Sequence, residues 1–168
     1  MKRMLPIAGV LVLILTVNGC GFHLRGWTLE SNIGSAHVVT DGRNFLAQPL
    51  RQALSSAGID TTGGSASDVT IRLLDQRNDR RNASVGAGVR VAEVETTLAV
   101  QFAIDDVQGA RLVTPRWIEG TRILFIDRSN ITGSSEEQVL VEAEIRNDLV
   151  QQIVRSLDIA LENRAGAP

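Results

Sequence analysis

The segment from Ser134 to Leu161, SSEEQVLVEAEIRNDLVQQIVRSLDIAL, places an apolar side chain at every fourth position. The series consists of Val141, Ile145, Leu149, Ile153, Leu157 and Leu161, and it is widened by Val150 and Val154. Because about 3.6 residues make one helical turn, these side chains line one face of a helix. Ser134 and Glu137 fit a capping box, which predicts that the helix begins there. A helix with one broad apolar face needs a sheet to pack against.

The middle of the chain supplies the strands of that sheet. From Val94 to Ile104 apolar and polar residues alternate, which is typical of a strand buried on one side. A shorter stretch of the same kind runs from Asp68 to Asp75. The segment from Leu112 to Ile126 predicts the returning strand of a hairpin, with interruptions near Pro115 and Gly120.

Two further elements precede these strands. Ala36 to Thr40 predicts a short strand, and Phe45 to Ala57 a helix with Pro49 in its first turn and Gly58 as its carboxyl-terminal cap. The order is therefore β-α-β-β-β-α. We expect an α+β fold in which two helices pack on one face of a mostly antiparallel or mixed four-stranded sheet. The first strand, which leads into a helix, could pair in parallel with a later one.

The amino terminus has the pattern of an export signal. A basic start at Lys2 and Arg3 is followed by an apolar run from Leu5 to Val17, which is too short for a comfortable transmembrane helix. The residues 17–20, VNGC, resemble the lipobox of bacterial lipoproteins. This predicts a signal peptide over residues 1–19 and a single domain over residues 20–168. Cys20 is then the lipidation site, with an S-diacylglycerol and an N-acyl chain as its covalent lipid.

Composition argues against catalysis and against nucleic-acid binding. Removing Lys2 and Arg3 from 17 basic groups leaves 15 against 19 acidic groups, a net charge of −4, so a global basic field is absent. The two histidines and the single cysteine show no metal-ligand spacing, and no Gly-x-Ser-x-Gly elbow occurs. We therefore expect no enzyme activity, no metal and no cofactor besides the lipid. Asp105 and Asp106 are interpreted as turn formers.

A group of arginines lies on the end of one predicted strand and on the connection to the next strand. Its members are Arg72, Arg77, Arg80, Arg81 and Arg90. One interpretation is a solvated loop whose arginines pair with Asp75, Asp79 and other acids. The other interpretation is contact with an anionic partner such as a phosphorylated lipid headgroup, because guanidinium groups bind phosphate in a bidentate manner.

The residues that follow the lipobox are CGFHLRG, from Cys20 to Gly26. This start resembles the mature start of the LPS-assembly lipoproteins, the LptE family of Gram-negative outer membranes. The order of elements is similar to that of the family as well. The resemblance implies a periplasmic domain, lipid-anchored in the cell outer membrane, that sits as a plug inside the lumen of the β-barrel LptD.

The resemblance also implies a function without enzymatic activity. The family binds lipopolysaccharide, helps the barrel assemble and aids insertion of the lipid at the cell surface. We expect Arg90 to lie near one of its basic lipid-binding positions, together with Arg77, Arg80 and Arg81. Ser134 stands where a second basic position falls, and Arg128 is its nearest substitute.

Two other functions remain open at this stage. The first is a different outer-membrane lipoprotein that scaffolds a secretion or envelope-assembly machine from the periplasmic side. The second is an anchored enzyme. Co-purification with a barrel of outer-membrane size separates LptE-like function from the scaffold, and turnover of a substrate would identify the enzyme.

Overall fold

The computed structural model describes residues 33–84, 91–127 and 131–165. It confirms the predicted α+β class and the order β-α-β-β-β-α. The elements are β1 (Ala36–Thr40), α2 (Ala47–Ser56), a short 3-10 helix (Gly64–Ala66), β2 (Val69–Ser84), β3 (Val91–Asp106), β4 (Arg111–Asp127) and α3 (Ile131–Ala165).

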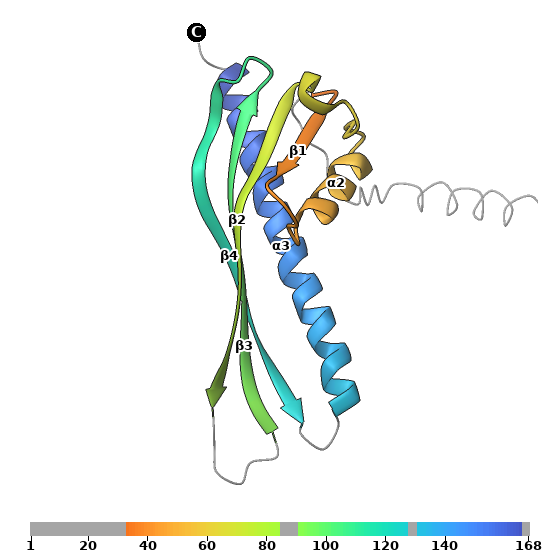
Figure 1. Cartoon of the computed structure of the whole chain (residues 1–168), viewed down its shortest axis with the longest axis vertical. Coiled ribbons are helices and arrows are strands. Elements are labelled where there is room, and N and C mark those ends of the chain that lie inside the picture. The colour runs from red at the N-terminus through yellow and green to blue at the C-terminus, as the bar shows by residue number, and fades with distance from the viewer. Residues whose placement is uncertain (1–32, 85–90, 128–130, 166–168) are drawn as a thin grey trace, which may run out of the picture.

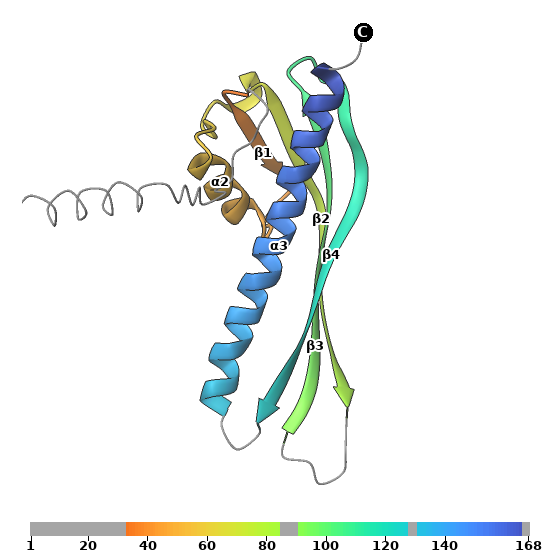
Figure 2. The same cartoon turned by 180° about the vertical axis from the view of Figure 1, so that it is seen from behind.

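The four strands form one mixed sheet in the order β1-β2-β3-β4. β1 runs parallel to β2 along the first residues of that strand, and the other pairs are antiparallel. Both helices lie on the same face of the sheet (Figures 1 and 2). We call the end that holds the start of β1 and the β3–β4 turn the proximal end. The opposite end, where β2 and β4 finish, is the distal end.

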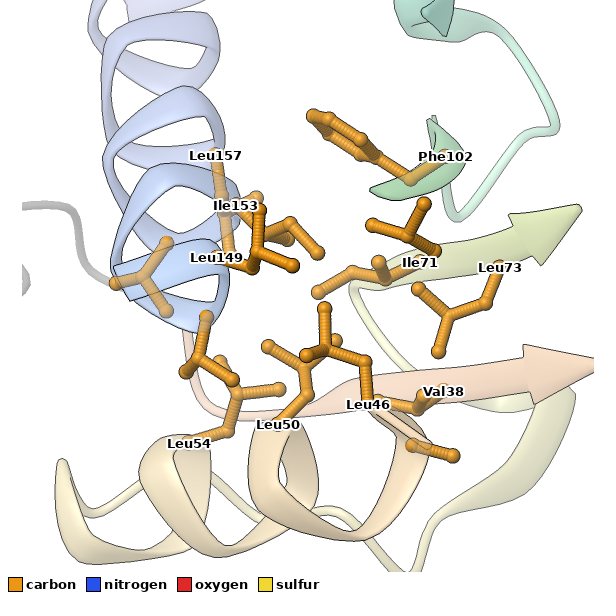
Figure 3. Packing of buried hydrophobic residues seen from close by; sticks show 14 of the residues in the cluster. Val38, Leu46, Leu50, Leu54, Ile71, Leu73, Phe102, Leu149, Ile153 and Leu157 are labelled. Carbon is orange, nitrogen blue, oxygen red and sulfur yellow. The ribbon is translucent and has the colours of Figure 1, made fainter. Parts of the chain in front are cut away.

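The core lies between the helices and the proximal part of the sheet (Figure 3). The side chains of Ile145, Leu149, Ile153 and Leu157 on α3 are fully buried, which confirms the stripe predicted from the sequence. They pack in one cluster with apolar residues of α2 and of β1, β2 and β3, among them Phe102. Full burial of each such side chain contributes about 1.5–3 kcal/mol, so this stripe fastens α3 to the sheet.

The predicted cap of α2 is confirmed in detail. Pro49 lies in the first turn, where its missing N–H costs no helical hydrogen bond. Gly58 has φ of 84° and donates its N–H to the carbonyl of Ser55 at 3.0 Å, while Ile59 donates to Leu54 at 3.0 Å. These two bonds form a Schellman motif, and only glycine adopts that φ without strain.

The start of β1 is fixed to the start of β2 by the carboxylate of Asp68. Its Oδ2 accepts the N–H groups of Gly34 and Ser35, each at 2.9 Å, and the hydroxyl of Ser35 at 3.1 Å. These donors stabilise the charged form of Asp68 and therefore lower its pKa below the ordinary value of 3.8. The N–H of Ser35 makes the largest contribution. At the proximal end, Asp68 thereby joins the residues just before β1 to the start of β2.

Three expectations about local structure are corrected. α3 begins at Ile131, so Ser134 lies within the helix and the capping-box prediction is wrong; only residues 128–130 separate β4 from the helix. β2 continues to Ser84, so the stretch after Asp75 is strand and not a connection. β4 is continuous from Arg111 to Asp127. Pro115 is accommodated at a register shift between β3 and β4, where no ladder hydrogen bond is required.

Gly120 interrupts nothing and instead allows α3 to approach β4. It lies near the middle of the edge strand β4 and pairs with Leu98 of β3, on the face that α3 covers. A Cβ atom at this position would lie 2.7 Å from Cγ2 of Ile145. The glycine is therefore required by packing, since any side chain would push the helix away from the sheet.

Candidate interaction site

The pairing of β2 with β3 divides the predicted arginine cluster between two faces of the sheet. Arg77 pairs in register with Ala99 and Arg81 with Glu95, on the face that no described helix covers. Arg80 pairs with Thr96 and points to the face of α3. Because successive side chains of a strand alternate, these arginines cannot form one patch on either face. Arg90, like Cys20 and Arg128, lies outside the described residues.

Arg77, Arg80 and Arg81 each contact another group of the chain. The Arg81 Nη2 atom lies 2.7 Å from the carboxylate of Glu95, and the Arg80 Nη2 atom lies 3.1 Å from that of Glu142 on α3. The guanidinium carbon of Arg77 stands 4.1 Å from the centre of the Trp117 ring, which is a cation–π contact. Arg72 pairs with Asp105 at 2.8 Å, so pairing with acids of the same chain is observed for three of the four described members of the cluster. Their partners are on β3 and α3 and are not Asp75 or Asp79.

A polar layer lies between α3 and the distal half of the sheet. Its strand side is the row Arg80, Thr96 and Arg122, which are register partners on β2, β3 and β4. Arg122 binds the carboxylate of Asp148 on α3, and Glu142 joins Arg80 to the helix. The hydroxyl of Thr96 is buried and has no hydrogen-bond partner. Beside this layer Val94 and Leu124 are buried in the next row of the same face, so the distal part of α3 meets both ion pairs and apolar side chains of the sheet.

The proximal end carries a second group of charges around Asp105 and Asp106. Asp106 accepts the N–H groups of Gln108 and Ala110, each at 2.8 Å, and lies 2.7 Å from Arg164 at the end of α3. Burial alone would raise the pKa of Asp106, but these donors and the arginine lower it overall. Asp105 pairs with arginines of β2 and β4. The turn-forming interpretation is thus confirmed for Asp106, which binds N–H groups of the hairpin turn, and is wrong for Asp105, which lies within β3 and pairs with arginines of the neighbouring strands.

The face of the sheet opposite the helices is not covered by any helix or strand of the described residues (Figures 1 and 2). An open groove of about 510 Å³ crosses its distal half, lined by polar and charged side chains of β2, β3 and β4. Within residues 33–84, 91–127 and 131–165, no group of three or more His, Cys, Asp or Glu is placed to hold a metal ion. In the same part of the chain, no helix is long and apolar enough to cross a membrane.

The sequence identified some of this surface and missed the rest. The outward position of Glu93 and Glu95 follows from the alternation of β3, and the structure confirms it. From the sequence, Trp117 was not identified as part of this surface. Trp117 follows Pro115 by two residues, and a proline within a strand is a signal of a nearby register shift between strands. The contact of Arg77 with Trp117 crosses an intervening strand, and no sequence pattern encodes it.

A sheet with one face covered by two helices and the other face open defines a two-layer α+β protein. Comparisons with known proteins narrow this class. The model of the LptE family, described as lipopolysaccharide-assembly, matches residues 38–157. The chain therefore belongs to the LptE family.

Individual relatives agree with this assignment. The chain is 26% identical over 147 residues to the LPS-assembly lipoprotein LptE of Photorhabdus laumondii, an alignment that covers 86% of this chain and 80% of the relative. The solution structure of uncharacterized lipoprotein B from Nitrosomonas europaea superposes with a TM-score of 0.65 and 26% identity, covering 82% of this chain and 90% of that one. The crystal structure of rare lipoprotein B from Shewanella oneidensis also has a TM-score of 0.65, at 21% identity over 78% and 98% of the two chains, and shares the fold.

Proposed function

We propose that this protein is a lipoprotein of the cell outer membrane that associates with the β-barrel LptD and helps to insert lipopolysaccharide at the cell surface. The observation that carries the proposal is the family match over residues 38–157. Acylation of Cys20 supplies the anchor, since two or three acyl chains hold a protein far more firmly than one. The same match favours this function over a scaffold for another secretion machine.

We assign the contact with lipopolysaccharide to the distal end of the sheet. Arg80 and Arg81 lie in the last rows of β2 before the segment that contains Arg90, and Arg77 lies further from that end, against Trp117. Arg80 and Arg81 already bind carboxylates through charge-assisted contacts. A phosphate, like a carboxylate, accepts two parallel N–H bonds from a guanidinium group and carries more charge, so it can compete with either acid.

The experiment that tests the barrel partnership is a pulldown. The mature lipidated chain is captured from outer membranes solubilised in detergent, and the expected result is co-purification of LptD in a stoichiometric complex. Recovery of the protein with a secretion pore, or with no barrel at all, would contradict the proposal.

The lipid contact is tested separately, with labelled lipopolysaccharide. Reversal of Arg77, Arg80, Arg81 and Arg90 to Glu should weaken lipid capture and lower the thermal midpoint, because a carboxylate at position 80 would face Glu142 of α3. Reversal of Arg77, Arg81 and Arg90 alone should weaken lipid capture and shift the midpoint little, because exposed ion pairs contribute only about 0–1 kcal/mol each. Replacement by Lys retains the charge but loses the bidentate geometry, so it distinguishes a specific grip from a diffuse field. Unchanged capture with all four reversed would move the lipid site elsewhere.

A further inference from the structure

The face of the sheet that the helices leave open has a defined composition. We call it the outer sheet face, from the row that contains Trp117 to the row that contains Phe125. It consists of Asp75, Arg77, Asp79 and Arg81 of β2, Glu93, Glu95, Thr97, Ala99 and Gln101 of β3, and Trp117, Glu119, Thr121, Ile123 and Phe125 of β4. No helix or strand of the described residues packs on it (Figures 1 and 2).

The outer sheet face is acidic. It holds five carboxylates and two arginines, a net charge of −3. Arg81 is neutralised by Glu95, and Arg77 is engaged with Trp117. Four of the acids, namely Asp75, Asp79, Glu93 and Glu119, take part in none of the ion pairs found among the described residues. They lie on three adjacent strands, and cationic side chains of a partner would be attracted to them.

The same face carries apolar side chains along the edge strand β4. Phe125 is 58% exposed, Ile123 is 55% exposed and Trp117 is 37% exposed. Ile123 and Phe125 are two residues apart and therefore neighbours on one side of the strand. Apolar groups lined up beside uncompensated charges are typical of surfaces that bind another protein, with the apolar part at the centre of contact.

We propose that the outer sheet face docks on a basic protein surface with an apolar recess, in which arginines or lysines meet Asp79, Glu93 and Glu119 and the recess receives Ile123 and Phe125. This inference rests on the proposed function, and the partner surface is then a patch of the barrel wall. The outer sheet face also carries Arg77 and Arg81, so the lipid contact proposed above adjoins the protein contact at the distal end of the sheet.

The test neutralises the face without changing its shape. The face variant combines Asp79→Asn, Glu93→Gln and Glu119→Gln. The control variant combines Glu136→Gln, Glu137→Gln and Glu162→Gln, three exposed acids of α3, and therefore changes the net charge by the same amount. Affinity for purified LptD of the same bacterium is measured for both variants at low and high salt.

We expect the face variant to bind LptD about tenfold more weakly than wild type, since three exposed pairs at a fraction of a kcal/mol each add up to about one factor of ten. Its dependence on salt should be flatter, because fewer charge contacts remain to be screened. The control variant should bind within about twofold of wild type. Equal binding by the wild type and the face variant would overturn the inference.

A second pair of variants tests the apolar part. Ile123→Ala should weaken binding to LptD several-fold, whereas Ile159→Ala should not. Ile159 is the same residue type, 57% exposed, on α3. A loss that is equal in both variants would contradict docking through this face.

Failure of the inference and failure of the proposed function give different results. If wild-type protein does not bind LptD at all, the proposed function fails. If wild type binds LptD and the face variant binds equally well, only the inference fails. Capture of lipopolysaccharide by the face variant should be unchanged or improved, and a selective loss of lipid capture would show that the face is a lipid site and would also overturn the inference.

Discussion

The close approach of α3 to β4 at Gly120 leads to a prediction about stability. In Gly120→Ala the new methyl would stand 2.7 Å from Cγ2 of Ile145, about 1 Å inside the ordinary contact of about 3.5–4.0 Å. Ile145 is fully buried and β-branched, so its side chain cannot rotate out of the way. Overpacking of this kind costs about 1–3 kcal/mol. Replacing glycine in a strand returns about 0.5–1 kcal/mol, so we expect a net loss of about 1–2 kcal/mol.

A double-mutant cycle separates this contact from other effects of the alanine. Ile145→Ala alone should cost about 2–5 kcal/mol through lost burial and a residual cavity. In that background the methyl of Gly120→Ala enters free space, so the second change should be neutral or stabilising. The two changes should therefore couple by about 1–3 kcal/mol. Urea denaturation of the mature chain, followed by circular dichroism, gives the four free energies of unfolding.

A control is available at Gly34, where a Cβ would lie 3.6 Å from the nearest carboxylate oxygen, an ordinary contact. Gly34→Ala should change the free energy of unfolding by less than about 1 kcal/mol. If the effects of Gly120→Ala and Ile145→Ala add within about 0.5 kcal/mol, the packing argument is refuted, because residues in contact do not behave additively.

Three further predictions test the anchor, the core and the proximal clamp. Cys20→Ser should accumulate as an uncleaved precursor without acyl groups, which intact-mass spectrometry detects; an acylated, cleaved product would contradict it. Leu149→Ala should cost about 2–5 kcal/mol, and a thermal midpoint close to wild type would mean that the stripe of α3 is not core. The pKa of Asp68 is lowered in the fold by N–H donors, so its stabilisation is present above pH 3.8 and is lost as pH falls through the folded pKa. The stability difference between wild type and Asp68→Asn should hence be constant at neutral pH and shrink below about pH 4, as melts over that range would show.

Elements whose burial follows a simple period were predictable from the sequence. The stripe of α3 has this property because one face of the helix is buried along most of its length. The alternation of β3 is equally clear, since Leu98, Val100 and Phe102 are buried while their neighbours face outward. Local turn chemistry was sufficient at Gly58, where a positive φ requires glycine.

The distal part of β2 was not predictable in this way. From Asp75 to Ser84 the strand is polar on both faces, because one face is the open outer sheet face and the other meets the polar layer beside α3. Its backbone hydrogen bonds come from β3, a partner that the local sequence does not reveal. For the same reason the arginines were interpreted as one cluster, although Arg80 lies on the opposite face from Arg77 and Arg81.

The clamp of Asp68 on the start of β1 has a mechanical consequence. A pull transmitted from a membrane anchor through the amino-terminal segment enters the fold at Gly34 and Ser35. Because β1 pairs in parallel with β2 over five residue pairs, a pull directed along the strand loads those pairs together, in shear, and does not unzip them one at a time. The three hydrogen bonds of Asp68 share the load at its point of entry. The shortest strand of the sheet is therefore joined to its neighbour in the arrangement that best resists a pull along the strand at the start of the described fold.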